Sequence, residues 1–259
     1  MDQVAFRIFN FDIHWYGVLA ALGFVLGFGT AGRRAPRAGI KSDTVFNLAP
    51  WLIVGTIIGA RLLYVTSYWD QEFAGKPFWH VFNMRAGLVF YGGLIGASLA
   101  GIIFCLRNKV PLWRMGDVMA PSIALGHALG RIGCFMTGCC WGKPWDGFCA
   151  VRFPVGHETH GTSVHPVQLY ESALNFAFYV GLAWLFRRRK FDGQVFAAYL
   201  VGYAIIRTIT ESFRGDYTKH YLGGILTPGQ TVSILIFAAG IALWLKQRSA
   251  RVPTLPAAA

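Results

Sequence analysis

The sequence predicts an all-α integral membrane protein with seven transmembrane helices, and three observations carry this prediction. The 259 residues are 54% hydrophobic and only 14% charged, whereas a soluble domain carries about 25% charged residues. Seven apolar runs are each long enough, at about 20 residues, to cross a bilayer as a helix. The net charge of +12 is spread unevenly between the connecting segments. In so apolar a chain this basic excess indicates membrane topology, and no nucleic-acid partner is expected.

The expected spans follow one another in order. The first is expected to be retained, because the residues before it are partly acidic where a signal peptide needs positive charge. The basic segments "GRRAPRAGIK" and "RRRK" follow the first and fifth runs. The fourth run contains His127 and Arg131, so an alternative has six spans with this segment re-entrant. The seven expected spans cover residues 14–32, 46–66, 88–106, 117–136, 167–186, 194–213 and 229–246.

The lysines and arginines between the spans predict the orientation. Of the 24 Lys and Arg residues, fourteen fall in one alternating set of connections, seven in the other and three inside spans. The positive-inside rule then places the N-terminus outside and the C-terminus in the cytoplasm, which requires an odd number of spans. Without an internal repeat, residues 1–259 are expected to form one membrane-embedded domain. Residues 137–166 would be a short extracytoplasmic cap packed by Trp141, Trp145, Phe148 and Phe153.

This orientation places the polar residues of the spans together in the outer half of the membrane. Such residues are costly in a bilayer and usually face a bundle interior or a wet cavity. Three arginines against two glutamates predict a guanidinium left over for an outside anion, and lipid phosphate is the nearest one. Snorkelling is the structural alternative, as is simple neutralisation of Arg207 by Glu211 four residues later. The set comprises His14, Tyr16, Arg61, Tyr91, Arg131, His165, Gln168, Glu171, Arg207 and Glu211.

Six motifs in this order resemble those of the prolipoprotein diacylglyceryl transferases. They are "HWYG" at 14–17, "GARLLYV" at 59–65, "FYGGLIG" at 90–96, "GRIGCFMTGCCWG" at 130–142, "HPVQLYE" at 165–171 and "GYAIIRTITESFR" at 202–214. The resemblance implies transfer of a diacylglyceryl group from phosphatidylglycerol to the lipobox cysteine of a prolipoprotein, forming a thioether and releasing glycerol phosphate. It implies a multi-pass protein of the bacterial cytoplasmic (inner) membrane with its active site toward the outer leaflet. No cofactor or metal is expected.

The resemblance also implies roles for individual residues. Arg131 and Arg207 match lipid-phosphate ligands, Tyr16 a functional tyrosine, Glu211 a supporting carboxylate and Gly142 the end of the signature. Arg61 is expected to join the arginines at the lipid phosphate.

The sequence does not decide which group activates the acceptor thiol. The family has a histidine where this chain has Tyr91, so Tyr91 is one candidate. His127 is another, because His127, Arg131 and Cys134 share one helix face. His14 and His165 are further possibilities.

The thiols depart from the family pattern, which has asparagine at Cys134 and Thr137 and glutamate at Cys139. The C-x4-C-C spacing matches no common metal or redox motif, so no metal site is expected. Open alternatives are a disulfide from Cys149 to Cys139 or Cys140, free thiols that fill space, and a catalytic thiol. A family paralogue or lipid carrier with a different acceptor, or a membrane thiol–disulfide oxidoreductase, would be the alternative functions.

Overall fold

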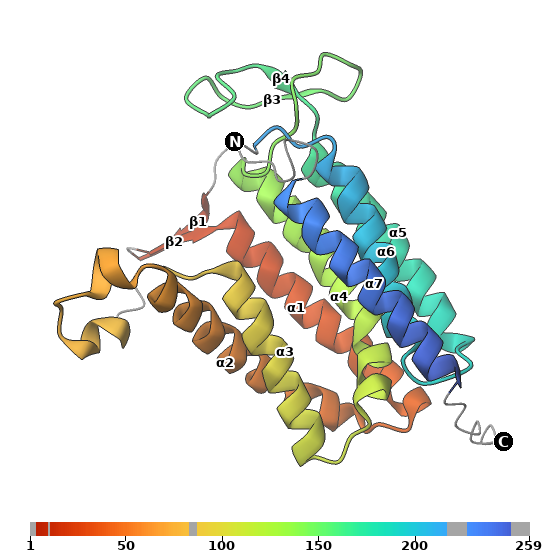
Figure 1. Cartoon of the computed structure of the whole chain (residues 1–259). Coiled ribbons are helices and arrows are strands. Elements are labelled where there is room, and N and C mark those ends of the chain that lie inside the picture. The colour runs from red at the N-terminus through yellow and green to blue at the C-terminus, as the bar shows by residue number, and fades with distance from the viewer. Residues whose placement is uncertain (1–3, 10, 83–86, 217–226, 250–259) are drawn as a thin grey trace. The chain divides into compact units, whose positions relative to one another are not determined.

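The structure is a computed structural model that describes residues 4–9, 11–82, 87–216 and 227–249, and these residues are mostly helical (Figure 1). Arg85, Lys219 and Arg251 of the charge pattern lie outside this range. The long helices are α1 (Trp15–Arg34), α2 (Ser42–Ser67), α3 (Phe90–Arg107), α4 (Leu112–Thr137), α5 (Val167–Arg187), α6 (Gln194–Glu211) and α7 (Pro228–Ser249). Short helical turns cover Ala35–Ala38, Trp69–Phe73 and Phe78–Phe82.

Each expected span coincides with one of these long helices. Five of them, α1 to α4 and α7, are long and apolar enough to cross a membrane, which agrees with an all-α membrane protein. The helices α5 and α6 occupy the fifth and sixth expected spans but are not among these five. Helix α4 is one helix that runs through His127 and Arg131 and is among these five, which favours a span over the re-entrant alternative.

Two short antiparallel strand pairs lie outside the helices and were not expected from the sequence. Strands β1 (Val4–Ile8) and β2 (Phe11–His14) pair directly before α1, with Val4 opposite His14. His14 therefore ends a strand and does not begin the first helix. Strands β3 (Val151–Arg152) and β4 (Ser163–Val164) pair within the loop between α4 and α5.

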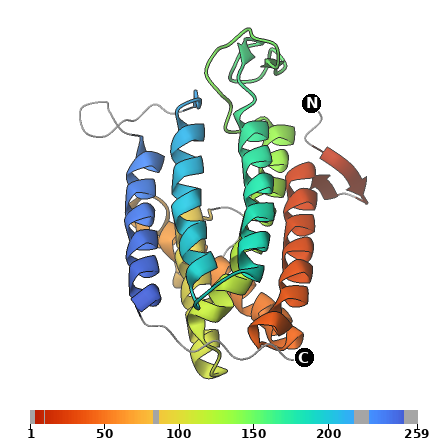
Figure 2. The same ribbon diagram turned by 90° about the vertical axis from the view of Figure 1, so that its right-hand side faces the viewer.

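The chain divides into two compact units, which are described separately. The first comprises Met1–Ala31 with Gly116–Ala259, and the second comprises Gly32–Met115. In the first unit α1 packs on α4, where the Ser122 hydroxyl donates to the Gly27 carbonyl at 2.6 Å. Helix α6 lies between α5 and α7 and contacts both (Figure 2). The unit thus brings α4, α5 and α6 together, and these helices carry most of the polar residues singled out above.

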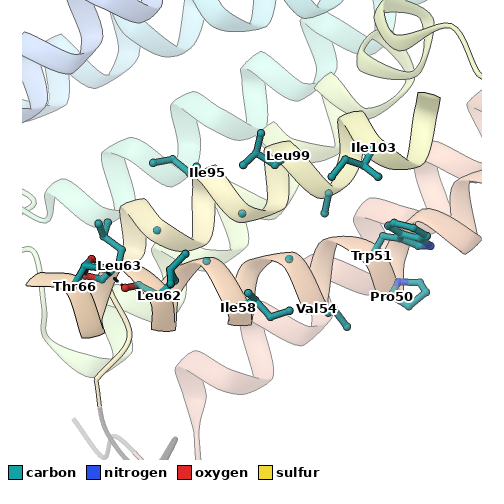
Figure 3. Close-up of a pocket in the computed structure, with 15 residues that line it drawn as sticks. Pro50, Trp51, Val54, Ile58, Leu62, Leu63, Thr66, Ile95, Leu99 and Ile103 are labelled. Atoms are coloured by element: carbon teal, nitrogen blue, oxygen red, sulfur yellow. Dashed lines mark hydrogen bonds between the residues drawn. The ribbon is translucent and has the colours of Figure 1, made fainter. Parts of the chain in front are cut away.

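The second unit is a tight pair of helices, α2 and α3. Their glycines form a seam so close that a Cβ on Gly96 would lie 2.1 Å from the Gly55 carbonyl oxygen, and one on Gly92 would lie 2.3 Å from that of Gly59. The glycines of "GGLIG" thus let the two backbones approach closely, as small residues do between membrane helices. Leucine, isoleucine and valine side chains flank the seam and line an apolar groove of about 750 Å³ (Figure 3).

A buried carboxylate fixes the start of α6. Gly193 precedes this helix and offers no side chain to cap it. Asp117 of α4 takes that role from another helix, because its two oxygens accept the backbone N–H groups of Gly193, Val195 and Phe196 at 2.8, 2.9 and 2.9 Å. Its side chain is fully buried. Asp117 therefore ties α4 to the first turn of α6, where the helix dipole also favours a negative charge.

Replacing Asp117 with alanine is expected to lower the free energy of unfolding by about 2–4 kcal/mol, because three buried N–H groups lose their acceptor. Asp117→Asn keeps one oxygen acceptor and should lose less. Thermal unfolding of the detergent-solubilised full chain measures both. An alanine variant as stable as the asparagine variant would contradict this account.

Candidate functional site

The Glu171 carboxylate is the centre of a buried ionic network in the first unit. Its side chain is only 1% exposed and projects from the first turns of α5. One oxygen lies 3.1 Å from His127 Nε2 and 3.7 Å from Arg207 Nη1, and the other lies 3.0 Å from Arg131 Nε. Glu171 thus joins α4 to α6 through charge, since His127 and Arg131 are on α4 and Arg207 is on α6.

A second carboxylate holds the other side of Arg207. Arg207 Nη2 lies 2.6 Å from an oxygen of Glu211, one turn further along α6. The second Glu211 oxygen accepts the Thr227 hydroxyl at 3.0 Å. The neutralisation of Arg207 by Glu211 considered from the sequence is confirmed. The arginine is held between two buried carboxylates, so its orientation is fixed before any ligand arrives.

His127 contacts both ionic partners through one ring nitrogen. Its Nε2 lies 3.1 Å from the Glu171 carboxylate and accepts a hydrogen bond from Arg131 Nε at 3.3 Å. Arg131 Nε also lies 3.0 Å from the other Glu171 oxygen. His127 is thus part of the ionic network through Nε2.

Charge balance in this network differs from the sequence expectation. Arg131 and Arg207 face Glu171 and Glu211, so these two arginines are balanced, and Arg61, the third arginine of the expected excess, lies in the second unit. What is left over instead is a hydrogen-bond donor of Arg131. Within the described residues Arg131 Nη2 has no partner, and the side chain is 13% exposed. Arg131 can therefore donate to a further anion while its charge stays anchored on Glu171.

Two expected site residues lie in the second unit. All three Arg61 nitrogens donate to backbone carbonyls: Nε to Val81 at 2.8 Å, Nη1 to Gly87 at 3.1 Å and Nη2 to His80 at 3.2 Å. This arrangement favours a structural role for Arg61, and its binding of lipid phosphate stays a prediction. Tyr91 lies in the first turn of α3 and is 49% exposed. Its part in thiol activation also stays a prediction.

Tyr16 lies beside the thiols that follow α4. It is on the first turn of α1 and is 48% exposed. Its ring packs on Gly133, where an added Cβ would lie 3.1 Å from Tyr16 Cδ2. Its hydroxyl interacts electrostatically with Arg131, Cys134 and Cys139. Tyr16 and Arg131 thus face the same thiol-bearing turn.

The loop between α4 and α5 packs only in part as expected. Phe153 is buried and stacks on His157 at 4.5 Å, and Trp145 stacks on His165 at 4.3 Å. Phe148, by contrast, is fully exposed, so its expected packing role is wrong. Burial and the charge of Lys143 lower the pKa of His165, which makes its ring a weak base.

The cysteines form no disulfide in the described structure. All five are free, and the Cys149 sulfur lies 3.2 Å from the Tyr170 hydroxyl. The alternative in which Cys149 pairs with Cys139 or Cys140 is therefore wrong. Hydrogen bonds from the Cys134 and Cys139 thiols, with the charge of Arg214, lower the pKa of the Cys140 thiol.

Comparison with known proteins decides the family. The family model described as prolipoprotein diacylglyceryl transferase matches residues 3–246. The chain belongs to the prolipoprotein diacylglyceryl transferase family.

Several curated relatives carry the name phosphatidylglycerol–prolipoprotein diacylglyceryl transferase. One from Finegoldia magna is 36% identical over 250 residues, covering 96% of this chain and 96% of the relative. One from Clostridioides difficile is 36% identical over 242 residues, covering 93% of each chain. One from Bordetella bronchiseptica is 34% identical over 250 residues, covering 95% of each chain. The likeness thus extends over nearly the whole chain.

The signature of this family member ends at Gly142, where two segments of backbone meet. Gly142 bridges to Arg214, just after α6, and flanking hydrogen bonds join Lys143 N to Phe213 O at 2.8 Å and Gly215 N to Trp141 O at 3.0 Å. A Cβ on Gly142 would lie 2.4 Å from the His165 carbonyl oxygen. Gly142 is thus placed to fasten the end of α4 to the end of α6, and its expected direct contact with lipid phosphate stays a prediction.

Replacing Gly142 with alanine is expected to destabilise the protein by about 1–3 kcal/mol, because the clash is with backbone and not with a movable side chain. Loss of the bridge should also lower activity, since the arginines of α4 and α6 would lose their common anchor. Thermal unfolding and transfer assays measure the two effects. Gly156→Ala is the matched control in the same loop, because a Cβ there meets no atom within 4 Å. Equal behaviour of the two variants would contradict this role.

Proposed function

We propose that this member of the family transfers the diacylglyceryl group of phosphatidylglycerol to the lipobox cysteine thiol of prolipoproteins. The products are a thioether and glycerol phosphate. The names of the full-length relatives support the reaction. The observation that links this reaction to residues of this chain is the pair of arginines, Arg131 and Arg207, held by Glu171 and Glu211.

Arg131 and Arg207 bind the phosphate of the lipid in this proposal. The reaction breaks the bond between the glycerol carbon and the phosphate oxygen, so negative charge grows on the leaving phosphate. Guanidinium groups that are already oriented stabilise such charge without reorganisation, and they do so best where water is scarce. Arg131 offers Nη2, while Glu171 and Glu211 hold both guanidinium planes in place.

The acceptor thiol must lose its proton before its sulfur attacks the glycerol carbon. A free thiol is mostly protonated near neutral pH, so a neighbouring group has to favour the thiolate. His127 is one candidate base, because it lies within the ionic network, 3.1 Å from the Glu171 carboxylate. Tyr16 and Tyr91 are the other candidates, and Tyr16 lies beside Arg131 and the thiols that follow α4.

Seven helices cross the bacterial cytoplasmic membrane in this proposal, with the N-terminus outside and the C-terminus in the cytoplasm. The charges at the helix ends support the orientation. The last turns of α1, α3, α5 and α7 carry basic residues, whereas those of α2, α4 and α6 carry none. The positive-inside rule places the ends of the odd-numbered helices in the cytoplasm. The ionic network, at the beginning of α5 and the end of α6, then lies toward the outer leaflet.

The direct test supplies the purified full chain with phosphatidylglycerol vesicles and a peptide containing a lipobox cysteine. Mass spectrometry should detect the thioether-linked diacylglyceryl peptide. A peptide with serine in place of the acceptor cysteine, and vesicles of phosphatidylcholine alone, are the controls that should give no product. Absence of product from folded protein would contradict the proposal and favour a family paralogue with a different acceptor.

A further inference from the structure

Three thiols meet at the end of α4, although their spacing matches no common metal motif. The sulfurs of Cys134, Cys139 and Cys140 all lie within 4.8 Å of one another. A metal ion bound to three thiolates at about 2.3 Å requires sulfurs about 4 Å apart. The three sulfurs therefore need to move little to bind one ion.

The way α4 ends explains this proximity. The N–H of Cys139 donates to the Cys134 carbonyl at 3.1 Å, and the N–H of Gly138 donates to the Phe135 carbonyl at 3.2 Å. Gly138 has φ +79°. These are the features of a Schellman motif, whose geometry brings the third-last helical residue against the residue after the left-handed one. That contact is usually apolar, and here both of its residues are cysteines.

The turn after α4 is held from outside as well. The Gly138 carbonyl accepts from His157 Nε2 at 2.8 Å, and the Cys139 carbonyl accepts from the buried Gln168 amide at 2.7 Å. Cys140 follows with φ +61°, a conformation that is uncommon for a residue with a side chain. This turn brings the third sulfur to the other two. The thiols thus sit on backbone that is fixed before any ion binds.

We propose that Cys134, Cys139 and Cys140 bind one thiolate-preferring metal ion, Zn²⁺ in the first instance, and leave its fourth coordination position open. Thiolates select Zn²⁺ and Cu⁺ over the harder cations. Three protein ligands with a vacant fourth position are the arrangement of catalytic zinc, whereas structural sites are closed by four. Among the described residues, the only histidine, cysteine, aspartate or glutamate group arranged for a metal is this one.

The surrounding charge suits three thiolates around a divalent ion, which carry a net charge of −1. Arg131 Nη1 lies 3.9 Å from the Cys134 sulfur. Arg214 interacts electrostatically with Cys140. Both guanidinium groups offset the extra negative charge, and Arg131 also donates a hydrogen bond toward sulfur, as the surroundings of metal-bound thiolates commonly do. The same Arg131 belongs to the ionic network, so the metal would lie next to the proposed phosphate site.

The open coordination position gives the ion a task in catalysis, namely activation of the acceptor thiol. This task rests on the proposed function. The acceptor thiol binds to the metal and releases its proton to water, because a coordinated thiol is deprotonated. The bound sulfur then uses an electron pair to form the bond to the glycerol carbon. The carbon–oxygen bond breaks, and its pair leaves with the phosphate that Arg131 and Arg207 hold. This would replace the base that the family histidine supplies where this chain has Tyr91.

The site is tested by metal content, independently of transfer. The purified full chain, reduced and stripped with a chelator, is loaded with Zn²⁺ and separated from excess ion. Elemental analysis should find one zinc per chain. Loading with Co²⁺ instead should give the thiolate-to-cobalt charge-transfer band and the strong visible bands of a tetrahedral site. Cys134→Ser, Cys139→Ser and Cys140→Asn should each abolish both signals; asparagine is chosen at Cys140 because it tolerates positive φ. Cys149→Ser, in the same loop but outside the cluster, is the matched control and should keep both.

Absence of stoichiometric metal from the folded parent chain, or its retention after the three cluster substitutions, would overturn the site. The task is tested by the transfer rate of the stripped protein, which should fall by about 10²-fold or more and recover with Zn²⁺. Addition of the lipobox peptide should also shift the cobalt spectrum, and a serine peptide should not. Unchanged transfer without metal would overturn the task. If the metal-loaded protein makes no thioether at all, the proposed function fails, and the metal content still decides the site.

Discussion

Replacing Arg207 with lysine is expected to reduce the rate of diacylglyceryl transfer by about 10²–10³-fold, while the protein remains folded. Arg207 lies 2.6 Å from Glu211 and 3.7 Å from Glu171 through different nitrogens of one plane. A lysine keeps the positive charge but has one nitrogen, so it cannot pair with both carboxylates and still present donors to a phosphate. The loss should therefore appear in activity much more than in stability.

Initial rates of thioether formation with phosphatidylglycerol vesicles and a lipobox peptide measure this effect. Arg188→Lys is the matched control, because Arg188 is exposed at the end of α5 and its guanidinium lies 4.6 Å from the ring centre of Trp184. It lies outside the network and should keep its rate. A rate for Arg207→Lys close to that of the control would contradict the role of the planar guanidinium.

Replacing Glu171 with glutamine is expected to lower the free energy of unfolding by about 3–5 kcal/mol and to abolish transfer. The carboxylate is 1% exposed and is the shared partner of His127, Arg131 and Arg207. Glutamine has nearly the same shape but no charge, so it leaves Arg131 buried without its counter-ion. Removing one partner of a buried ion pair costs more than the pair itself contributes.

Chemical or thermal unfolding of the full chain measures the loss. Glu158→Gln is the matched control, since Glu158 is an acidic residue of the exposed loop that accepts from Trp141 Nε1 at 3.2 Å. The double variant Glu171→Gln with Arg131→Gln should recover part of the stability, because it removes the uncompensated charge, and none of the activity. A single Glu171→Gln variant as stable as the control would show that Glu171 does not carry the network.

The helices were predictable because their apolar runs are long. The strands β1 and β3 were not, since each is a few residues long and depends on a partner strand. Glu171 was recognised as polar and outward, yet it was not assigned to the site. Its importance lies in three partners on two other helices, and only the packing of α4, α5 and α6 reveals that.

Arg61 and the thiols show two other reasons for incomplete prediction. Depth in the membrane follows from position along a helix, but the direction of a side chain does not, and Arg61 turns toward the backbone carbonyls of His80, Val81 and Gly87. The C-x4-C-C spacing matches no common metal or redox motif, so the spacing alone does not predict that the thiols meet. The useful signal was Gly138 between Cys134 and Cys139, which predicts a Schellman motif with cysteines at its two contacting positions.

The division of the chain into two units has a consequence for its synthesis. The unit of α2 and α3 is continuous in sequence. Helices α1 and α4, which pack on each other, are separated along the sequence by that unit. The glycine seam can close as soon as α3 has been made, because its two helices follow one another directly in the sequence, joined by residues 68–89. Helix α1 has to wait in the membrane until α4 emerges from the ribosome before Ser122 can reach Gly27. The first helix made therefore finds its partner only after α2 and α3 have been made, and mutations at that contact should delay maturation of the newly made chain more than they harm the finished protein.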